Sequence, residues 1–184
     1  MTTNKNIKIS TCLWFDNQAE EAVKYYTSIL PDSKTGKITR YGREGYDIHK
    51  KPAGSVMTVQ FWLLGNEYLA LNGGPLFRFN ESISLVVQCE TQEEIDRYWE
   101  KLSEGGDKSA QACGWLKDKY GLSWQIVPRL LEEMQNSPDT EKTERLMNAI
   151  MKMKKLDIAA LKRAFDNKDA GSQIKKAPTE LHSL

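Results

Sequence analysis

The stretch Ala19-Glu-Glu-Ala-Val-Lys-Tyr-Tyr26 returns 73 residues later as Gln92-Glu-Glu-Ile-Asp-Arg-Tyr-Trp99. Both copies contain Glu-Glu, a basic residue, a tyrosine and a second aromatic residue at the same offset. Apolar residues recur in the first copy at i, i+3, i+4 and i+7, which predicts a helix over 18–30, and the second copy predicts one over 91–102. Because each helix follows a strand-like segment, we interpret the repeat as a duplicated β-α-β-β-β unit.

Alternating apolar and polar residues predict the strands of the first unit. The strand before the helix covers residues 7–15, and residues 36–55, which contain several Gly and Pro, hold a short strand and a mobile loop. Residues 56–64 and 67–72 form a hairpin, because Gly65-Asn66 supplies a turn in which glycine accepts a positive φ.

The second unit repeats this order, and helices follow it. A strand over 82–89 precedes the second helix, and short strands are predicted around 109–117 and 122–128. After Pro128 the pattern is helical: a short segment over 129–136, a helix from Ser137-Pro138 to about residue 155, and a last helix capped by Asp157.

These segments predict an α+β fold with three parts. The paired β-α-β-β-β units occupy residues 7–128, a C-terminal helical extension occupies 129–167, and a tail over 168–184 has too little apolar content to fold.

Charge and cysteine content argue against several classes of partner. The 26 Lys and Arg residues offset 25 Asp and Glu, leaving a net charge of +1, which gives no electrostatic basis for binding nucleic acid or a membrane surface. Apolar runs are too short to span a bilayer, and the N-terminus lacks the apolar stretch of a signal peptide. Three scattered cysteines predict neither a disulfide framework nor a zinc ribbon. We therefore expect a cytoplasmic protein.

Several motifs resemble those of one superfamily. A duplicated β-α-β-β-β unit with Leu-x-Phe before an Ala-Glu-Glu-Ala-x-x-Tyr-Tyr helix resembles the vicinal oxygen chelate superfamily, which includes glyoxalase, extradiol dioxygenases and antibiotic-resistance proteins. Within it, the chain is similar to the PhnB-like group, often labelled demethylubiquinone methyltransferase domains. The matching stretches are residues 11–16, 71–75, 77–80, 151–161 and Cys113-Gly-Trp-Leu-Lys-Asp-Lys-Tyr-Gly-Leu-Ser-Trp-Gln125. The resemblance implies curved mixed sheets that form a cup, and a homodimer.

The resemblance also implies where a metal ion would bind. The superfamily's ligand positions fall on Ser10 or Cys12, on Ser82, and on Gln125, and none of these is a histidine or a carboxylate. His49 and His182 lie in the predicted loop and tail. Because a hydroxyl or an amide does not replace imidazole or carboxylate at useful affinity, we expect no metal and no cofactor. The segment after the first strand also lacks the Gly-rich loop of a Rossmann methyltransferase, so methyl transfer is not expected.

Strand alternation suggests a ligand-binding surface. It places Trp14, Thr58, Gln60, Trp62 and Asn72 opposite the helix, where aromatic rings with a few amides suit a small, partly aromatic molecule. The alternative is that this face is a second core layer. The predicted ligand-binding set also includes four residues outside this group: Cys12, Phe79, Asn80 and Gln125.

Other roles for these residues stay open at the level of sequence. Phe79 and Asn80, in the linker between units, either close over the cup or form a packed crossover segment. We assign no catalytic role to Asp16, Glu67 or Glu81, which lie at strand ends or turns. Three functions remain: a metal-free binding protein for a small molecule, an isomerase, lyase or oxygenase with non-standard metal ligands, and an interaction protein with a closed cup.

Overall fold

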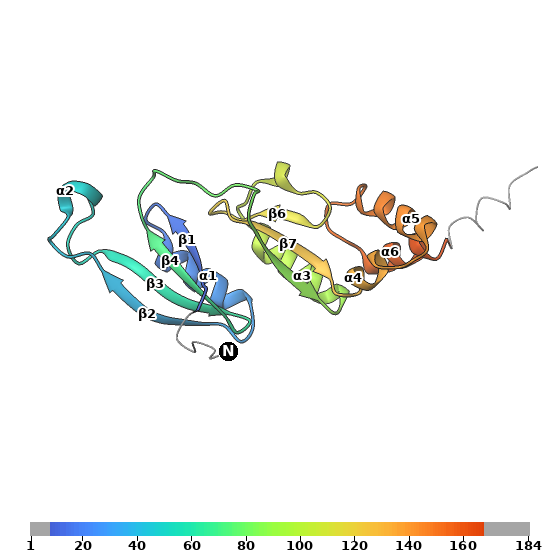
Figure 1. Cartoon of the computed structure of the whole chain (residues 1–184), viewed down its shortest axis with the longest axis horizontal. Coiled ribbons are helices and arrows are strands. Elements are labelled where there is room, and N and C mark those ends of the chain that lie inside the picture. Colours follow the sequence, from blue (N-terminus) through green and yellow to red (C-terminus); the bar gives the residue numbers. More distant parts are fainter. Residues whose placement is uncertain (1–7, 168–184) are drawn as a thin grey trace, which may run out of the picture. The chain divides into compact units, whose positions relative to one another are not determined.

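The computed structural model describes residues 8–167, so the predicted tail over 168–184 lies outside the described residues. The chain divides into two compact units, which we call unit 1 (Met1–Glu81) and unit 2 (Ser82–Leu184). Figure 1 shows the ribbon coloured along the chain, from blue in unit 1 to red in unit 2. None of the helices in the part of the chain that the structure describes is long and apolar enough to cross a membrane.

Unit 1 has the predicted β-α-β-β-β order. Its elements are β1 (Thr11–Phe15), α1 (Ala19–Ile29), β2 (Lys34–Arg40), the short α2 (Tyr46–His49), β3 (Val56–Leu63) and β4 (Asn66–Asn72). The strand order in the sheet is β1-β4-β3-β2, with β1 parallel to β4 and the other pairs antiparallel. The predicted hairpin is therefore β3–β4, with Gly65 at φ +79° in its turn.

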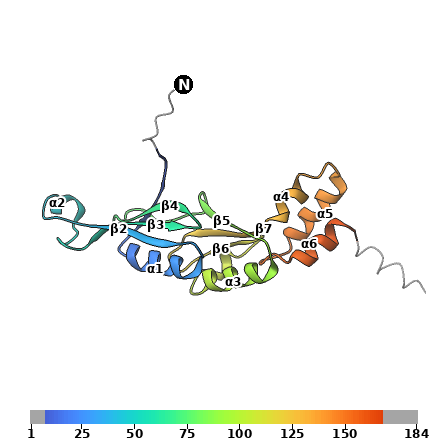
Figure 2. The ribbon, with the colours of Figure 1, turned by 90° about the horizontal axis from the view of Figure 1, so that it is seen from below.

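The core of unit 1 lies between the sheet and α1, which covers one sheet face (Figure 2). Leu13, Val59 and Ala70 form one cross-strand row that points toward α1, and all three are buried. The helix contributes residues at the predicted spacing: Ala19, Ala22, Val23 and Tyr26. We call the opposite side of this sheet the distal face. It carries the strand residues that alternate with the buried ones, such as Cys12, Gln60 and Leu69.

The sheet of unit 2 has three strands within residues 82–167, which fall in the three predicted segments, whereas a full β-α-β-β-β unit has four. It contains β5 (Ser84–Cys89), α3 (Gln92–Ser103), β6 (Trp115–Lys117) and β7 (Ser123–Pro128), with strand order β5-β7-β6. The predicted strand around 109–117 is a 3₁₀ turn, η1 (Lys108–Ala110), followed by the short β6.

Local hydrogen bonds explain this difference in unit 2. The carboxylate of Asp107 accepts hydrogen bonds from the backbone and the hydroxyl of Ser109, which closes a turn instead of extending the chain. Cys113 and Gly114 both have positive φ, so the chain reverses just before β6. The α+β class is confirmed, but the second unit is β-α-β-β.

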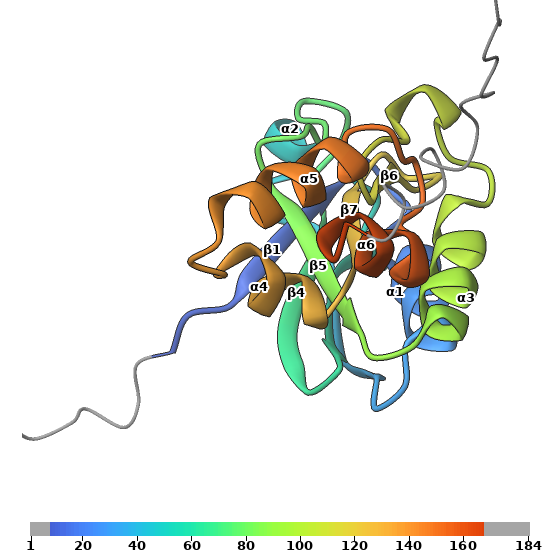
Figure 3. The same cartoon turned by 90° about the vertical axis from the view of Figure 1, so that its right-hand side faces the viewer.

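Three helices make up the extension: α4 (Leu130–Gln135), α5 (Thr140–Ile150) and α6 (Ile158–Phe165), which cluster together in Figure 3. Asp157 caps α6 as predicted, because its side chain accepts from the N–H of Ala160. The middle helix starts after Asp139, not Ser137, and ends before the predicted residue 155. Beyond it, the carbonyls of Met153 and Lys154 accept hydrogen bonds from residues 113 and 114. The apolar core of the extension consists of Leu131, Met134, Leu146, Ile150, Leu156 and Leu161.

Candidate functional site

Strand register brings most of the predicted ligand-binding residues of unit 1 onto the distal face. Cys12 lies opposite Leu69, which lies opposite Gln60, and Trp14, Leu71 and Thr58 form the next row. Cys12 is exposed, and the side chains of Thr58, Gln60 and Trp62 are partly exposed. Within the described unit this face is therefore not a dry core layer.

A shallow depression of about 250 Å³ lies on the distal face. Six of its seven lining residues are polar, and they come from the chain before β1 and from β2, β3 and β4: Ser10, Lys37, Thr39, Thr58, Gln60, Glu67 and Leu69. Thr39 and Thr58 face each other across the β2–β3 pair, with 2.5 Å between their hydroxyl oxygens. The lining offers hydroxyl, amide, ammonium and carboxylate groups to a ligand.

Glu67 is the carboxylate of this depression. Lys8 Nζ donates to both of its oxygens, at 2.7 and 2.9 Å, and Gln60 Nε2 donates to Oε1 at 2.8 Å. The hydrogen bond from Lys8, with that from Gln60, lowers the pKa of Glu67, so the group is ionised at neutral pH. Because Glu67 follows a turn, the sequence predicts no catalytic role for it and does not place it among the ligand-binding residues. The sequence did contain a signal for its location: Glu67 and Leu69 are two positions apart on one strand, so their side chains lie on the same face.

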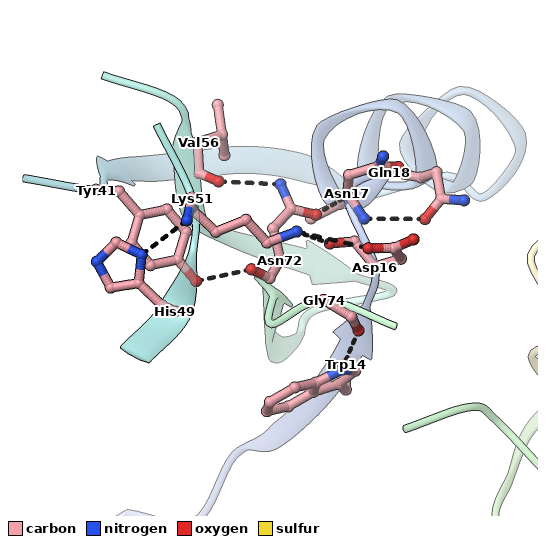
Figure 4. Close-up of polar contacts among 11 residues, drawn as sticks. Trp14, Asp16, Asn17, Gln18, Tyr41, His49, Lys51, Val56, Asn72 and Gly74 are labelled. Carbon is pink, nitrogen blue, oxygen red and sulfur yellow. Dashed lines mark hydrogen bonds and ion pairs between the residues drawn. The ribbon is translucent and has the colours of Figure 1, made fainter. Parts of the chain in front are cut away.

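The two tryptophans of the distal face lie beside the depression and not in its lining. Trp62 packs against β2, where a Cβ at Gly36 would lie 2.5 Å from the indole ring, and Lys34 Nζ is 4.9 Å from its centroid. Trp14 Nε1 donates to the carbonyl of Gly74 at 2.8 Å (Figure 4). Both indole rings therefore contact other parts of unit 1, whereas the sequence predicts that they contact a ligand.

Asn72 does not lie on the distal face, contrary to the prediction. It pairs with Phe15 in the sheet, is 5% exposed, and points toward α1. Its Oδ1 accepts from the N–H of Ala19 at 2.8 Å and its Nδ2 donates to the carbonyl of Val56 at 3.1 Å (Figure 4). Asn72 thus caps α1, whose N-cap residue Gln18 accepts from Asn17 N–H instead.

A second polar cluster lies where β1 and β4 end (Figure 4). Lys51 Nζ donates to the carbonyl of Asp16 at 2.7 Å and lies 3.5 Å from its carboxylate. The N–H of Lys51 donates to His49 Nδ1 at 3.0 Å, so His49 Nε2 carries the proton that it shares with the carbonyl of Glu44. Tyr41 donates to the carbonyl of Asn72 at 2.7 Å. These contacts join the segment after β2 to the strand ends, which is a structural role.

The remaining predicted residues lie elsewhere. The ring of Phe79 is 5.2 Å from that of Phe15, whose side chain faces α1, so Phe79 belongs to a packed linker and not to the distal face. Asn80 is exposed in the same linker. Gln125 belongs to unit 2, where its Nε2 donates to Ser84 Oγ at 2.9 Å.

The residues at the superfamily's metal-ligand positions do not fit a metal ion. The amide of Gln125 already bonds Ser84, and the single thiol of Cys12 supplies too few ligands for a metal ion. Among residues 8–167, no group of three His, Cys, Asp or Glu side chains lies close enough to hold a metal ion. The expected metal-free state stays a prediction.

Comparisons with known proteins find a matching family and similar solved structures. Residues 7–127 match the family described as 3-demethylubiquinone-9 3-methyltransferase. A solved structure of a putative 3-demethylubiquinone-9 3-methyltransferase, the PhnB protein from Bacillus cereus, is 36% identical and covers 66% of this chain and 99% of its own, with a TM-score of 0.56. Protein PA1353 from Pseudomonas aeruginosa is 18% identical over 67% of this chain and 98% of its own, with a TM-score of 0.50. A comparison with curated proteins gave no match.

Proposed function

Because the chain belongs to the PhnB-like family of 3-demethylubiquinone-9 3-methyltransferase domains, with its vicinal oxygen chelate fold, we propose that it binds a small polar molecule on the distal face of unit 1. The observation that carries this proposal is the depression between β2, β3 and β4, where six polar side chains gather beside Leu69. Ligand sites combine a concave surface with a few convergent polar groups, and this surface has both features.

The geometry changes the class of ligand expected from the sequence. Trp14 packs on Gly73 and Trp62 packs on Gly36, so the surface left for a ligand is mainly hydroxyl, amide and charged groups. A depression of about 250 Å³ is smaller than most drug-binding cavities. A small polar molecule suits it better than an extended aromatic one.

Larger depressions lie on the helical extension, but they support a ligand site less well. One of about 760 Å³ is lined by residues of α4 and α6 and by Ser137 and Pro138. It lies outside the residues that match the family, which end at 127. The distal face belongs to the domain that the relatives share, so we place the site there.

The two alternative functions have weaker support. For an enzyme, Glu67 would be the carboxylate base of the depression, but its lowered pKa makes it a weak proton acceptor. For a protein with a closed cup, the distal face would be filled by side chains, whereas Cys12 is exposed and Gln60 is partly exposed. A homodimer and a cytoplasmic location remain predictions.

A ligand screen read at a single side chain tests this proposal. The side-chain amide of Gln60 gives its own nitrogen–proton signal in an NMR spectrum, and polar compounds that bind in the depression should shift it. Gln60→Ala removes this signal, so its affinity is measured by titration calorimetry, and the binding of such a compound should weaken by about tenfold, which corresponds to one or two lost hydrogen bonds.

Gln88 supplies the matched control, because it is an exposed glutamine on a strand of unit 2. Gln88→Ala should leave the affinity unchanged. The proposal would be wrong if compounds that bind the protein do so equally well in Gln60→Ala and in wild type.

A further inference from the structure

Lys8 forms an ion pair with Glu67, the carboxylate of the depression. Its ammonium contacts both oxygens of Glu67, while the neighbouring Ile9 is 99% exposed. The side chain of Lys8 itself remains 67% exposed, against 27% for Glu67. The ion pair therefore joins an exposed segment to a partly buried carboxylate.

Glu67 is held in place independently of Lys8. Gln60 Nε2 donates to Oε1 at 2.8 Å from the adjacent strand, where Gln60 lies one cross-strand row away from Glu67. The carboxylate would thus keep its orientation if Lys8 moved away. An ion pair with so exposed a lysine contributes little to stability, so another cation can displace it at small energetic cost.

We propose that Glu67 binds the ammonium group of an organic amine, and that Lys8 takes the place of this group when the site is free. The inference rests on the proposed function and adds to it the class of ligand. Charge-assisted hydrogen bonds from an ammonium to a carboxylate are stronger than neutral ones, so they suit the anchoring contact of a small ligand.

The rest of the lining defines the other end of the ligand. The hydroxyls of Thr39 and Thr58 and the carboxamide of Gln60 lie beside Glu67 and favour hydroxyl or carbonyl groups. Lys37, on β2, adds a positive charge to the lining, which disfavours a second cation. The ligand is therefore an amine whose far end is neutral or anionic, such as an amino alcohol or an amino acid.

Titration with three small probes tests this inference. Ethanolammonium chloride carries the cation, ethylene glycol is its neutral analogue, and sodium glycolate carries an anion. The measurement is the dissociation constant from the shift of the Gln60 side-chain amide at constant ionic strength. Ethanolammonium should bind saturably, and ethylene glycol and glycolate should bind much more weakly.

Three variants define the roles of the two residues. Glu67→Gln should weaken ethanolammonium binding by tenfold or more. Lys8→Ala, which removes the internal competitor from an exposed position, should tighten binding by about two- to fivefold. Lys24→Ala is the matched control, because it removes another exposed lysine–glutamate pair, with Glu20 on α1, and should change nothing.

The outcomes separate this inference from the function on which it rests. Unchanged affinity in Glu67→Gln, or weaker binding in Lys8→Ala, would overturn the inference. If ethylene glycol or glycolate shifts the Gln60 signal and ethanolammonium does not, the inference is wrong and the binding site stands. If neither these probes nor a library of polar compounds shifts the signal, both are wrong.

Discussion

The carboxamide of Asn72, at the end of β4, caps the first turn of α1 by accepting the N–H of Ala19 at 2.8 Å. The same side chain donates to the carbonyl of Val56 at the start of β3. One buried side-chain amide thus joins the helix to two strands of the sheet.

Replacing Asn72 should therefore destabilise unit 1. Asn72→Ala leaves the buried N–H of Ala19 and the partly buried carbonyl of Val56 without their partner, and we expect a loss of about 2 to 3 kcal/mol in the free energy of unfolding. Urea denaturation measures it. Asn148→Ala, at an exposed position of α5, should change stability by less than about 0.5 kcal/mol. Equal effects of the two substitutions would contradict the capping role.

Gly73 should not tolerate a side chain. A Cβ at this position would overlap the indole ring of Trp14, which donates to the neighbouring Gly74. Gly73→Ala should displace the ring, lower stability by about 1 to 3 kcal/mol and change the tryptophan fluorescence. At Gly42, a Cβ would meet its nearest neighbour at 4.0 Å, so Gly42→Ala should have little effect. A Gly73→Ala protein as stable as Gly42→Ala would show that Trp14 is not packed as described.

Asp118 organises the turn before β7 in unit 2. Its buried carboxylate accepts from the backbone N–H groups of Tyr120 and Leu122 and from the indole of Trp124, at 2.8 to 3.0 Å. Asp118→Ala should lower the free energy of unfolding by about 3 kcal/mol or more, because three donors lose their acceptor. The fully exposed Asp47 is the control, and Asp47→Ala should be neutral. Equal denaturation midpoints for Asp118→Ala and Asp47→Ala would disprove the role of Asp118.

Stability should depend on pH through Asp96. A hydrogen bond from Lys155, with one from Gln92, lowers the pKa of Asp96 in the folded protein, whereas an unfolded aspartate has a pKa of about 3.9. The ionised form therefore stabilises the fold above that value, and the contribution is lost as pH falls through the folded pKa.

Asp96→Asn should consequently be less stable than wild type at pH 7, and this difference should shrink as the pH falls below about 4. Denaturation at a series of pH values measures it, with Asp47→Asn as the control. A difference that stays constant with pH would mean that the charge of Asp96 is not responsible.

Sequence periodicity predicted much of the fold because the repeat fixes both helices and the strands before them. It also placed Thr58, Gln60 and Trp62 on one face, since alternation within a strand decides that. It failed for Asn72, because the face of a residue on β4 depends on which residue of β1 it pairs with. That pairing puts Asn72 opposite the buried Phe15.

Local hydrogen bonding limited the prediction elsewhere. The turn at Ser109 depends on the side chain of Asp107, and strand propensity does not reveal it. Glu67 is absent from the predicted ligand-binding residues because carboxylates beside a turn are usually solvated. Its partner Lys8 precedes β1, far from Glu67 in sequence.

NMR mapping of a bound polar compound is the decisive test of ligand binding on the distal face of unit 1. Shifted signals should gather at Ser10, Thr58, Gln60, Glu67 and Leu69. Shifts that gather instead around Met134, Pro138 and Phe165 of the helical extension would contradict it.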